Sequence, residues 1–346
     1  MALRPLTPHQ LRSVTRGELR VDGWPTAPTP DVLTVDLDEL AEGGRVPLPG
    51  TAVVGVLVGL TEREDPEQHP ARAACDVAMH YGDPTLAAIE RNVEAHPIAA
   101  ASLALLLRGA EGRTVDEGLL AESAAYSTLQ AGPEFAAWAA ARGERTTTGE
   151  RLTGRTPTGD DGLVLDRDGG VLHLVLDRQH VRNALNAATL QSLVDALRMA
   201  AGDPELDEVH LWGRGDSFCA GGDLNEFGTF SDPATAHLVR LDRSVGAAMW
   251  SMRDRVTAHL HGACAGSGIE LPAFAGTVLG APSTTVSLPE LSLGLIPGAG
   301  GTVSLPRRIG RHRTAWLVLS GESVDAITAL RWGLLDDLDE EHAARP

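Results

Sequence analysis

Lysine is absent from this sequence of 346 residues, so each of its 29 basic residues is an arginine. Acidic residues outnumber them at 47, which leaves a formal net charge of -18, and no block of basic residues interrupts the chain. Binding to nucleic acid or to an anionic membrane surface needs a basic patch or stripe. The charge pattern therefore argues against both classes of partner.

Cysteine and long apolar runs are also scarce. Cys75, Cys219 and Cys264 are widely separated and form no CxxC pair, which favours a reducing compartment over a disulfide framework. The longest apolar runs, residues 51–60 and 98–107, are well short of the roughly 20 residues that span a bilayer, and the first ten residues lack a signal-peptide pattern. We therefore expect a soluble, cytoplasmic protein.

The composition changes along the chain and divides it into three parts. Residues 1–145 predict a mainly helical region. Residues 146–162 are rich in threonine, glycine and charge, with little to bury, which is typical of a linker. Residues 163–346 then form the second predicted domain.

Within the N-terminal region, residues 32–40 and 51–60 suggest two short strands, and the second is apolar enough to be buried on both faces. From residue 70 to 142 apolar residues recur at helical spacing, which predicts several helices.

The second domain begins with the pattern of an α/β crossover. Residues 163–166 and 171–177 alternate around Asp168-Gly169-Gly170, which predicts a hairpin. Asn186 is a suitable N-cap for a helix with apolar residues at i, i+3, i+4 and i+7, and residues 208–212 predict the next strand. This order predicts an α/β fold. A helix at 234–252 and a strand at 256–260 are expected to follow.

The stretch from Ala258 to Thr302 is rich in glycine and apolar residues and contains two glutamates, Glu270 and Glu290. A charged side chain in such surroundings is costly unless it is paired or used in chemistry. A glycine turn precedes the first glutamate and a second turn follows the other, so backbone can approach closely at both. We expect an acid/base site here.

Four motifs resemble those of the enoyl-CoA hydratase/isomerase (crotonase) superfamily, in the same order and at similar spacing over about half the chain. They are Arg182-Asn183-Ala184-Leu185-Asn186, Phe218-Cys219-Ala220-Gly221-Gly222-Asp223-Leu224, His261-Gly262-Ala263-Cys264-Ala265-Gly266-Ser267-Gly268-Ile269-Glu270-Leu271, and Leu288-Pro289-Glu290 with Gly294 to Thr302. Together they are specific, whereas one glycine motif alone is weak.

The resemblance implies a spiral of ββα units and an acyl-CoA thioester substrate. It also implies an oxyanion hole of two backbone N–H groups, which by motif position are those of Ala220 and Ser267. Such donors stabilise the negative charge of a thioester enolate by several kcal/mol. Ser267 is a departure, because relatives more usually have glycine there.

By the same resemblance Glu270 and Glu290 match the two acids of the hydratase branch. A carboxylate pair sharing a water can activate it and protonate the α-carbon, so hydration of a 2-enoyl-CoA, or the reverse dehydration, is the leading prediction. Alternatives are isomerisation, thioester hydrolysis, tailoring of a secondary metabolite including dioxygenase-like chemistry, and a non-catalytic acyl-CoA-binding or scaffold subunit. We expect no metal and no cofactor beyond the CoA of the substrate, and a homotrimer or hexamer.

The resemblance also implies residues that contact the substrate or its CoA moiety. They are Arg182, Ala184, Gly221, Gly222, Asp223, Leu224 and Gly266. For Asp223 we expect the role of a helix N-cap that orders the oxyanion loop. Cys219 and Cys264 are expected to be small buried residues.

Several basic residues and histidines allow more than one interpretation. The cluster Arg307, Arg308, Arg311, His312 and Arg313 fits a solvated helix face or a subunit contact slightly better than attraction of CoA phosphates. Arg178, His180 and Arg182 are rivals for the phosphate role. His259 and His261 alternate as strand neighbours on one face, which makes a metal pair an alternative although no third ligand stands at a recognisable spacing.

The chain ends soon after Trp332-Gly333-Leu334-Leu335-Asp336, where relatives continue into helices that cover the acyl pocket and build a trimer. Residues 87–142 resemble those helices. We therefore hypothesise a permuted order, in which the N-terminal helices stand in for the missing tail.

Overall fold

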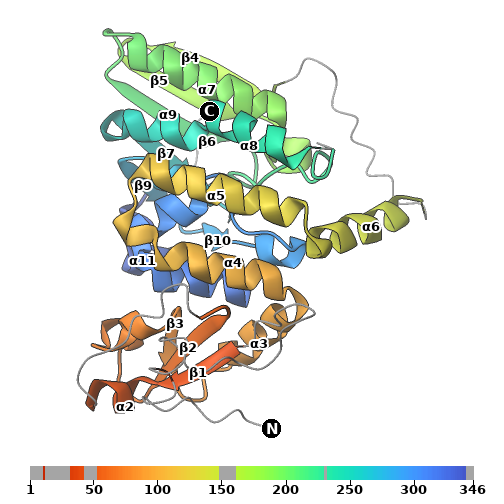
Figure 1. Cartoon of the computed structure of the whole chain (residues 1–346). Coiled ribbons are helices and arrows are strands. Elements are labelled where there is room, and N and C mark those ends of the chain that lie inside the picture. Colours follow the sequence, from red (N-terminus) through yellow and green to blue (C-terminus); the bar gives the residue numbers. More distant parts are fainter. Residues whose placement is uncertain (1–10, 12–31, 43–52, 148–160, 230–231, 340–346) are drawn as a thin grey trace.

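The computed structural model describes residues 11, 32–42, 53–147, 161–229 and 232–339 (Figure 1). The middle of the predicted linker, residues 148–160, lies outside the described residues. Three sheets and the helices around them make up the described part of the chain, so the predicted α/β class is confirmed. No helix among the described residues is both long enough and apolar enough to cross a membrane.

The largest sheet has six strands in the order β12-β9-β7-β6-β5-β4. The hairpin of β4 and β5 is antiparallel, with Asp168 opposite Val171 and Gly169 in the turn at a φ of 59°, as the sequence predicts. All other neighbours in this sheet are parallel. The strands are β4 (Leu163–Asp168), β5 (Val171–Leu176), β6 (Glu208–Gly213), β7 (Val256–Leu260), β9 (Thr277–Gly280) and β12 (Asp337–Leu338).

Three helices accompany this sheet. The helix α7 (Ala187–Gly202) connects β5 to β6, and the Asn186 side chain caps it by accepting a hydrogen bond from Thr189 N, as predicted. The prediction of a single helix at 234–252 is wrong, because the chain forms two helices there, α8 (Pro233–Asp242) and α9 (Val245–Ser251). The Ser244 side chain starts α9 as a new N-cap, and Ser and Thr favour such caps over helix interiors.

A small second sheet, β11-β10-β8, carries the glycine-rich stretch. Its strands are β8 (Ala263–Ala265), β10 (Thr285–Ser287) and β11 (Val324–Asp325). The helix α10 (Ser267–Glu270) follows β8, and the 3-10 helix η7 (Glu290–Leu293) follows β10. The long helix α11 (Gly301–Ser320), bent at Gly310, and α12 (Ala326–Trp332) come next.

The N-terminal region contains a third sheet, in which β1 (Val32–Asp36), β2 (Val56–Thr61) and β3 (Val77–His80) are parallel. The expected burial of β2 on both faces is confirmed, because all six of its residues are buried. The helical prediction is wrong at residues 77–80, which form β3. Three of these four residues are buried, in a strand paired with β2 and packed against α11, and tertiary contacts of this kind override local propensity.

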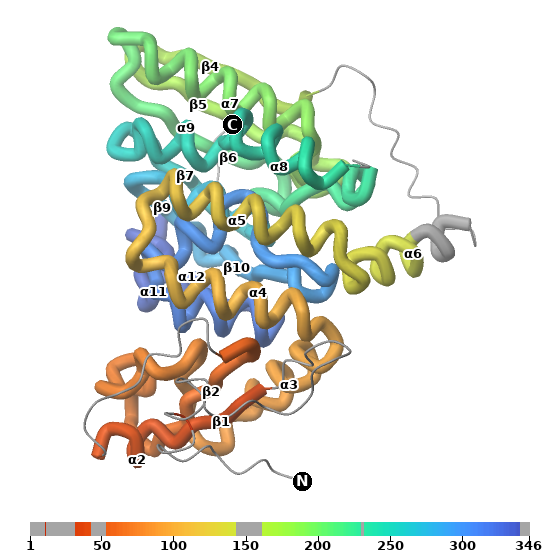
Figure 2. Tube along the Cα trace, viewed as in Figure 1, coloured from red at the N-terminus to blue at the C-terminus, as the bar shows by residue number. Residues whose placement is uncertain are grey.

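The N-terminal helices pack directly onto the rest of the molecule (Figure 2). The helices α3 and α4 lie against α11, and α5 lies against α8 and α11. One continuous hydrophobic core includes Leu103 of α4, Leu119 of α5 and Leu305 of α11. The helices of this region are α2 (Leu37–Glu42), α3 (Thr85–Ala95), α4 (Pro97–Arg108), α5 (Val115–Gln130) and α6 (Pro133–Thr147).

Candidate functional site

The two predicted glutamates lie at the ends of neighbouring parallel strands. The strands β8 and β10 pair in parallel, with Ala265 opposite Ser287, so the segments that follow them start side by side. Glu270 ends α10 and is 2% exposed, and Glu290 begins η7 and is 8% exposed. Figure 1 shows β10 in the middle of the molecule, between the layer of α5 and that of α11. The carboxylates are therefore buried between the small sheet and the helices.

Glu270 is fixed by the turn that starts α11. Its Oε2 accepts hydrogen bonds of 2.8 Å from both Ala299 N and Gly301 N. The first N–H groups of a helix have no partner within the helix, so a carboxylate at this position satisfies them. One oxygen of Glu270 is thus committed to the protein.

A third buried carboxylate, Glu122 of α5, reaches the same turn, and the sequence interpretation missed it. Its Oε1 accepts from Gly300 N at 2.7 Å, and its Oε2 accepts from Thr302 N at 2.8 Å and Thr302 Oγ1 at 2.7 Å. A signal was present in the sequence, because Glu122 occupies one position of a helical stripe that is otherwise apolar. The stripe consists of Val115, Leu119, Glu122, Tyr126 and Leu129, all buried.

Burial raises the pKa values of all three carboxylates. Burial raises the pKa of Glu290 to about 7, and the charge of Glu122 adds to the effect. Burial also raises the pKa of Glu122 to about 7, although its hydrogen bonds from Thr302 and Gly300 act in the opposite direction. The pKa of Glu270 is raised well above its ordinary value by burial and by the charges of Glu290 and Glu122. The group therefore retains protons near neutral pH, as acid/base chemistry requires.

Two buried oxygen atoms at the site have no hydrogen-bond partner in the described part of the chain. They are Glu290 Oε2 and Ser267 Oγ. A buried polar atom without a partner is costly and is uncommon in native proteins. These atoms are free to bind a water molecule or a polar group of a ligand.

The loops at 219–222 and 264–268 run alongside each other. Cys219 N donates to Ala263 O at 3.2 Å, and Ala265 N donates to Cys219 O at 3.0 Å. A Cβ placed on Gly266 would lie 3.8 Å from the Gly221 Cα, so the two glycines are in close contact. Cys219 and Cys264 are fully buried, as predicted, and burial raises the pKa of the Cys219 thiol to about 12.

The prediction of Ala220 as an oxyanion donor is wrong for this conformation. Its N–H already donates to the Arg182 carbonyl at 2.9 Å. Within the described residues, nothing accepts a hydrogen bond from the N–H of Gly222 or of Ser267. The flanking bonds, Leu185 N to Gly221 O and Asp223 N to Leu185 O, hold Gly222 between them. The pair of N–H groups that remains available is that of Gly222 and Ser267.

Asp223 is not a helix N-cap, because residues 224–228 form turns rather than a helix. Its carboxylate pairs with the guanidinium of Arg178 at 3.1 Å and accepts from Asn225 N at 3.1 Å. Arg178 is 1% exposed and also donates to the Ala184 carbonyl, so it is unsuited to hold the phosphates of a ligand. Asp223 therefore orders the loop at 219–222 through an ion pair.

The other predicted contact residues are distributed around these loops. Ala184 is buried, whereas Arg182 and its neighbour His180 are exposed. Leu224 is 38% exposed. Gly222 lies against the ring of Phe227, since a Cβ at that position would be 2.8 Å from a ring carbon. Of the three proposed phosphate ligands in this segment, only Arg182 and His180 are accessible.

The basic cluster on α11 makes contacts within the protein. Arg311 and His312 are buried and donate to carbonyl groups of the segment 72–75. Arg308 pairs with Asp336 at 3.1 Å, and the Arg313 guanidinium lies 5.4 Å from the ring centre of Trp332. These contacts favour a structural role over attraction of CoA phosphates, although two members are buried and not on the expected solvated face.

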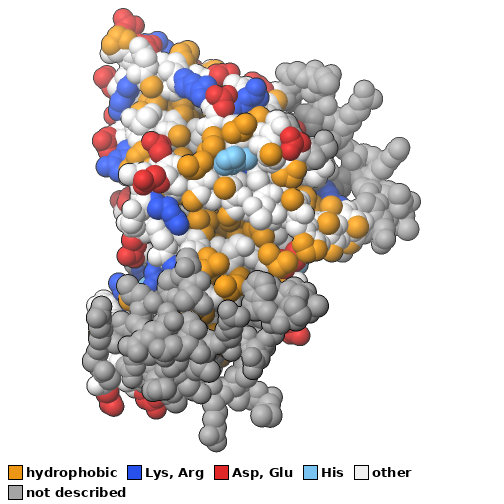
Figure 3. All heavy atoms as spheres, viewed as in Figure 1, with side chains coloured by type: hydrophobic (Ala, Val, Ile, Leu, Met, Phe, Trp, Pro, Cys, Tyr) orange, Lys and Arg blue, Asp and Glu red, His pale blue; other side chains and the backbone are white. Residues whose placement is uncertain are grey.

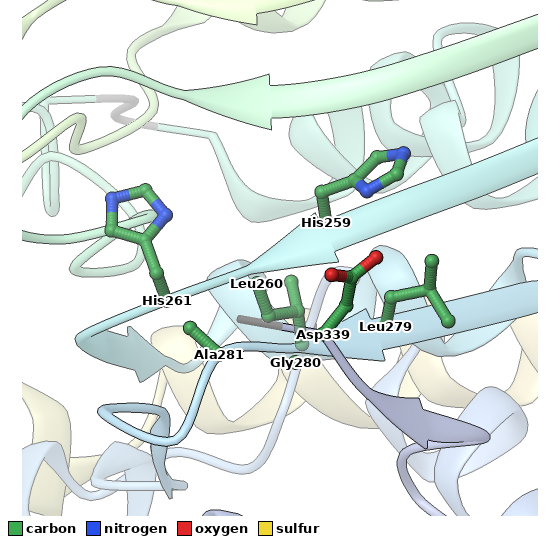
Figure 4. Close-up of a pocket in the computed structure, with 7 residues that line it drawn as sticks. All are labelled: His259, Leu260, His261, Leu279, Gly280, Ala281 and Asp339. Atoms are coloured by element: carbon green, nitrogen blue, oxygen red, sulfur yellow. The ribbon is translucent and has the colours of Figure 1, made fainter. Parts of the chain in front are cut away.

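His259 and His261 line a shallow pocket beside β7 and β9, and Figure 4 shows both rings on the same side of the chain. His259 stacks on Trp212, with ring centres 3.6 Å apart, and its Nε2 lies 2.8 Å from His210 Nδ1. Among the described residues, no group of three or more metal-ligating side chains is suited to hold a metal. None of the predicted site residues lines this pocket.

Helices of the N-terminal region cover the acid pair. Gly298 lies against the ring of Tyr126 on α5, and Gly294, which follows Glu290, lies against Glu134 on α6. Phe135 of α6 lies against Gly228, in the segment that follows the loop at 219–222. Close packing of this kind leaves no room for a Cβ at Gly298 or Gly294. The site is thus built by both halves of the chain.

The second half of the chain is similar to known proteins. A sequence profile of the family described as enoyl-CoA hydratase/isomerase matches residues 166–343. The chain is 36% identical over 176 residues to the 2,3-dehydroadipyl-CoA hydratase of Escherichia coli. The aligned region is 51% of this chain and 68% of that protein. It is 33% identical over 183 residues to the putative enoyl-CoA hydratase/isomerase YhaR of Bacillus subtilis. The aligned region is 52% of this chain and 71% of that protein. The crystal structure of an enoyl-CoA hydratase from Thermoplasma volcanium is 32% identical, with a TM-score of 0.49, and covers 54% of this chain and 75% of that one.

Proposed function

The chain belongs to the enoyl-CoA hydratase/isomerase family, and on that premise we propose that it hydrates a 2-enoyl-CoA, or dehydrates the corresponding 3-hydroxyacyl-CoA. The observation that carries the proposal is the buried pair of Glu270 and Glu290 beside two loops with available N–H groups. The pair has the raised pKa values that proton transfer near neutral pH requires.

In this proposal the thioester carbonyl accepts hydrogen bonds from Gly222 N–H and Ser267 N–H. Negative charge develops on that oxygen when a nucleophile adds to the β-carbon. Two fixed donors stabilise the resulting enolate, and the loss of one such donor costs about 3 kcal/mol in comparable sites. Ser267 starts α10 on the glycine turn, so its N–H is also one of the unsatisfied donors of a helix start.

The two glutamates divide the remaining proton transfers. Glu270 accepts a proton from water as the water oxygen bonds to the β-carbon, and Glu290 donates its own proton to the α-carbon. Glu290 Oε2 suits this donation because no described residue holds it, whereas Glu270 Oε2 is held by two N–H groups. One proton leaves water and one reaches carbon, so the pair returns to its starting state after one proton moves between them. The reaction needs no cofactor beyond the CoA of the substrate.

Arg182 and His180 are proposed to attract the phosphates of CoA. Both are exposed and lie in the segment before α7, which contacts the loop at 219–222 through the hydrogen bond from Ala220 N to Arg182 O. Arg182 also has a left-handed backbone, with a φ of 53°, and its carbonyl holds the Ala220 N–H. A strained backbone is kept where the surrounding structure requires it, often at ligand sites.

We further propose that α3 to α6 take the place of the C-terminal helices of relatives. The support is that α5 and α6 contact the glycines that flank the acid pair. Hydrophobic side chains are exposed on the face of α5 and α8, where Leu120 and Leu238 are 51% and 65% exposed (Figure 3). Such a surface suits assembly into the proposed trimer or hexamer.

A second candidate is double-bond isomerisation, which needs one acid/base group instead of two. Glu290 Oε2, which has no partner among the described residues, favours it, because a single carboxyl can move a proton between two carbons of an acyl chain. Hydration, unlike isomerisation, also requires Glu270 to activate water. A variant that lacks only the Glu270 carboxylate therefore separates the two.

The test is turnover of a panel of 2-enoyl-CoA and 3-enoyl-CoA thioesters by the wild type, Glu270→Gln and Glu290→Gln. Hydration requires both glutamates, so each variant should lose at least about 100-fold in kcat. Isomerisation that survives in Glu270→Gln would replace hydration as the function. Retained binding of CoA without any turnover by the wild type would support a non-catalytic acyl-CoA-binding subunit.

A further inference from the structure

We propose that Glu122 is a positioning residue for the acid/base pair. It fixes the turn at residues 299–302, and the same turn donates hydrogen bonds to Glu270. The inference rests on the proposed function, since it assigns Glu122 a role in that reaction. The N-terminal region, which contains Glu122, would then contribute to the reaction in addition to covering the site. Its basis is the hydrogen-bond pattern of residues 299–302.

Four consecutive N–H groups of this turn are shared alternately between two carboxylates. Ala299 and Gly301 donate to Glu270, and Gly300 and Thr302 donate to Glu122. The turn therefore cannot shift toward either carboxylate without breaking bonds to the other. Among the described residues, Glu270 Oε2 accepts hydrogen bonds from this turn alone, so the position of the Glu270 carboxylate depends on Glu122.

The close packing of α5 against α11 brings Glu122 within hydrogen-bonding distance of the turn. Gly118, one helical turn earlier, lies against Val303, and a Cβ there would be 2.9 Å from Val303 Cγ2. A larger residue at 118 would push α5 away from the start of α11. A residue without a Cβ lets two helices approach closely, so that a side chain on one can reach the backbone of the other. The carboxylate thus reaches its donors without an intervening water molecule.

Arg240 of α8 also anchors α5. Its guanidinium donates to Ser123 Oγ at 3.2 Å and to Ser127 Oγ, and it lies 4.8 Å from the ring centre of Tyr126. Arg240 also acts on Glu122 as a nearby positive charge and opposes the rise in its pKa. The Glu122 charge in turn raises the pKa values of Glu270 and Glu290.

These contacts predict two separable effects of removing the Glu122 charge. The turn loosens, since an amide in place of the carboxylate turns an NH2 group toward backbone N–H donors. The pKa values of Glu270 and Glu290 fall, since a neighbouring negative charge is lost. A residue that only packs would produce the first effect without the second.

The first measurement is hydrogen–deuterium exchange of peptides that cover residues 298–303 in the wild type, Glu122→Gln and Glu122→Asp. We expect exchange to rise about tenfold or more in Glu122→Gln, in line with the loss of one to two net hydrogen bonds. The control is Asp116→Asn, which removes the same charge from an exposed position of the same helix. Unchanged exchange in Glu122→Gln would overturn the proposal, and this outcome does not depend on turnover.

The second measurement is the pH dependence of kcat with the enoyl-CoA that the wild type hydrates. In Glu122→Gln both limbs of the profile should move to lower pH by about one unit, with kcat reduced about 10- to 100-fold. Glu122→Asp should keep the limbs near their original pH, and Asp116→Asn should leave the profile unchanged. A fall in kcat with unmoved limbs would overturn the proposal and leave Glu122 a structural residue.

If Glu122→Gln does not fold, Thr302→Val is the second variant. It removes one donor to Glu122 and keeps every charge, so exchange of the turn should rise while the limbs stay in place. Unchanged exchange in Thr302→Val together with normal kcat would count against positioning through the turn. Absence of turnover by the wild type on every thioester would refute the proposed function alone, because the exchange result still decides the role of Glu122.

Discussion

Gly266 and Glu290 are in direct contact: a Cβ on Gly266 would lie 2.4 Å from Glu290 Oε1, closer than real Cβ atoms come to their neighbours. The backbone of Gly266 has a φ of 50° and a ψ of -124°, which side chains with a Cβ rarely adopt. This glycine lies between β8 and α10, so it sets both the direction of the Ser267 N–H and the room for the acid.

The first prediction follows from that contact. Gly266→Ala should lower kcat by at least about 100-fold, because the added methyl group displaces Glu290 and strains the oxyanion turn. The measurement is steady-state hydration of an enoyl-CoA. Gly169→Ala is the control, since Gly169 also has a positive φ but has nothing near its Cβ position. It should cost about 1 kcal/mol of stability and leave kcat unchanged; equal losses of kcat in both variants would contradict the prediction.

A second prediction concerns stability and pH. The folded-state pKa of Glu122 is raised from 4.5 to about 7, so the stability from this carboxyl is complete below about pH 4.5 and is lost as the pH rises through 7. Glu122→Gln cannot titrate. The free energy of unfolding of the wild type minus that of the variant should therefore fall between about pH 5 and 7, by up to about 1.4 kcal/mol per pH unit. Denaturant titrations at several pH values measure this difference, and a difference that rises with pH would refute it.

A third prediction concerns the hydroxyl group of Ser267. Its Oγ is buried without a partner among the described residues, whereas its N–H is the proposed oxyanion donor. Ser267→Ala keeps the N–H, so kcat should stay within about threefold, and the melting temperature should rise because an unsatisfied polar atom is removed. Thermal unfolding and steady-state kinetics test both parts. A loss of kcat above about tenfold would assign the hydroxyl a role in the reaction.

A fourth prediction concerns the two halves of the chain. A fragment that begins at Leu163 should be insoluble or inactive, because it exposes the faces of α8 and α11 that α5 and α4 cover and lacks Glu122. The control is the full chain cut at a protease site inserted between residues 148 and 160. The two pieces should elute together and keep activity, since they share one hydrophobic core. A soluble, active fragment from Leu163 would show that the N-terminal helices are dispensable.

Much of the second half could be predicted from the sequence because its signals are local. The hairpin around Gly169 and the cap at Asn186 depend on residues within a few positions of one another, and both are confirmed. The family was recognisable because its motifs combine unusual residue types at fixed spacing. The pairing of Glu270 with Glu290 follows from two short strands that each lead directly into an acid-bearing turn.

Other features depend on contacts between distant segments. The strand β3 forms against β2 and α11, within a segment whose spacing predicts helices. The N–H of Ala220 is taken by Arg182, 38 positions earlier, which moves the candidate donor to Gly222.

Sequence alone determined the family and two acids of this site, because residue types and short spacings encode local turns and caps. Tertiary structure decided which N–H groups remain available and added Glu122 from a helix 178 positions before the turn that it holds. The physical reason is that a buried donor or acceptor must find a partner, and only the folded packing decides which one it finds.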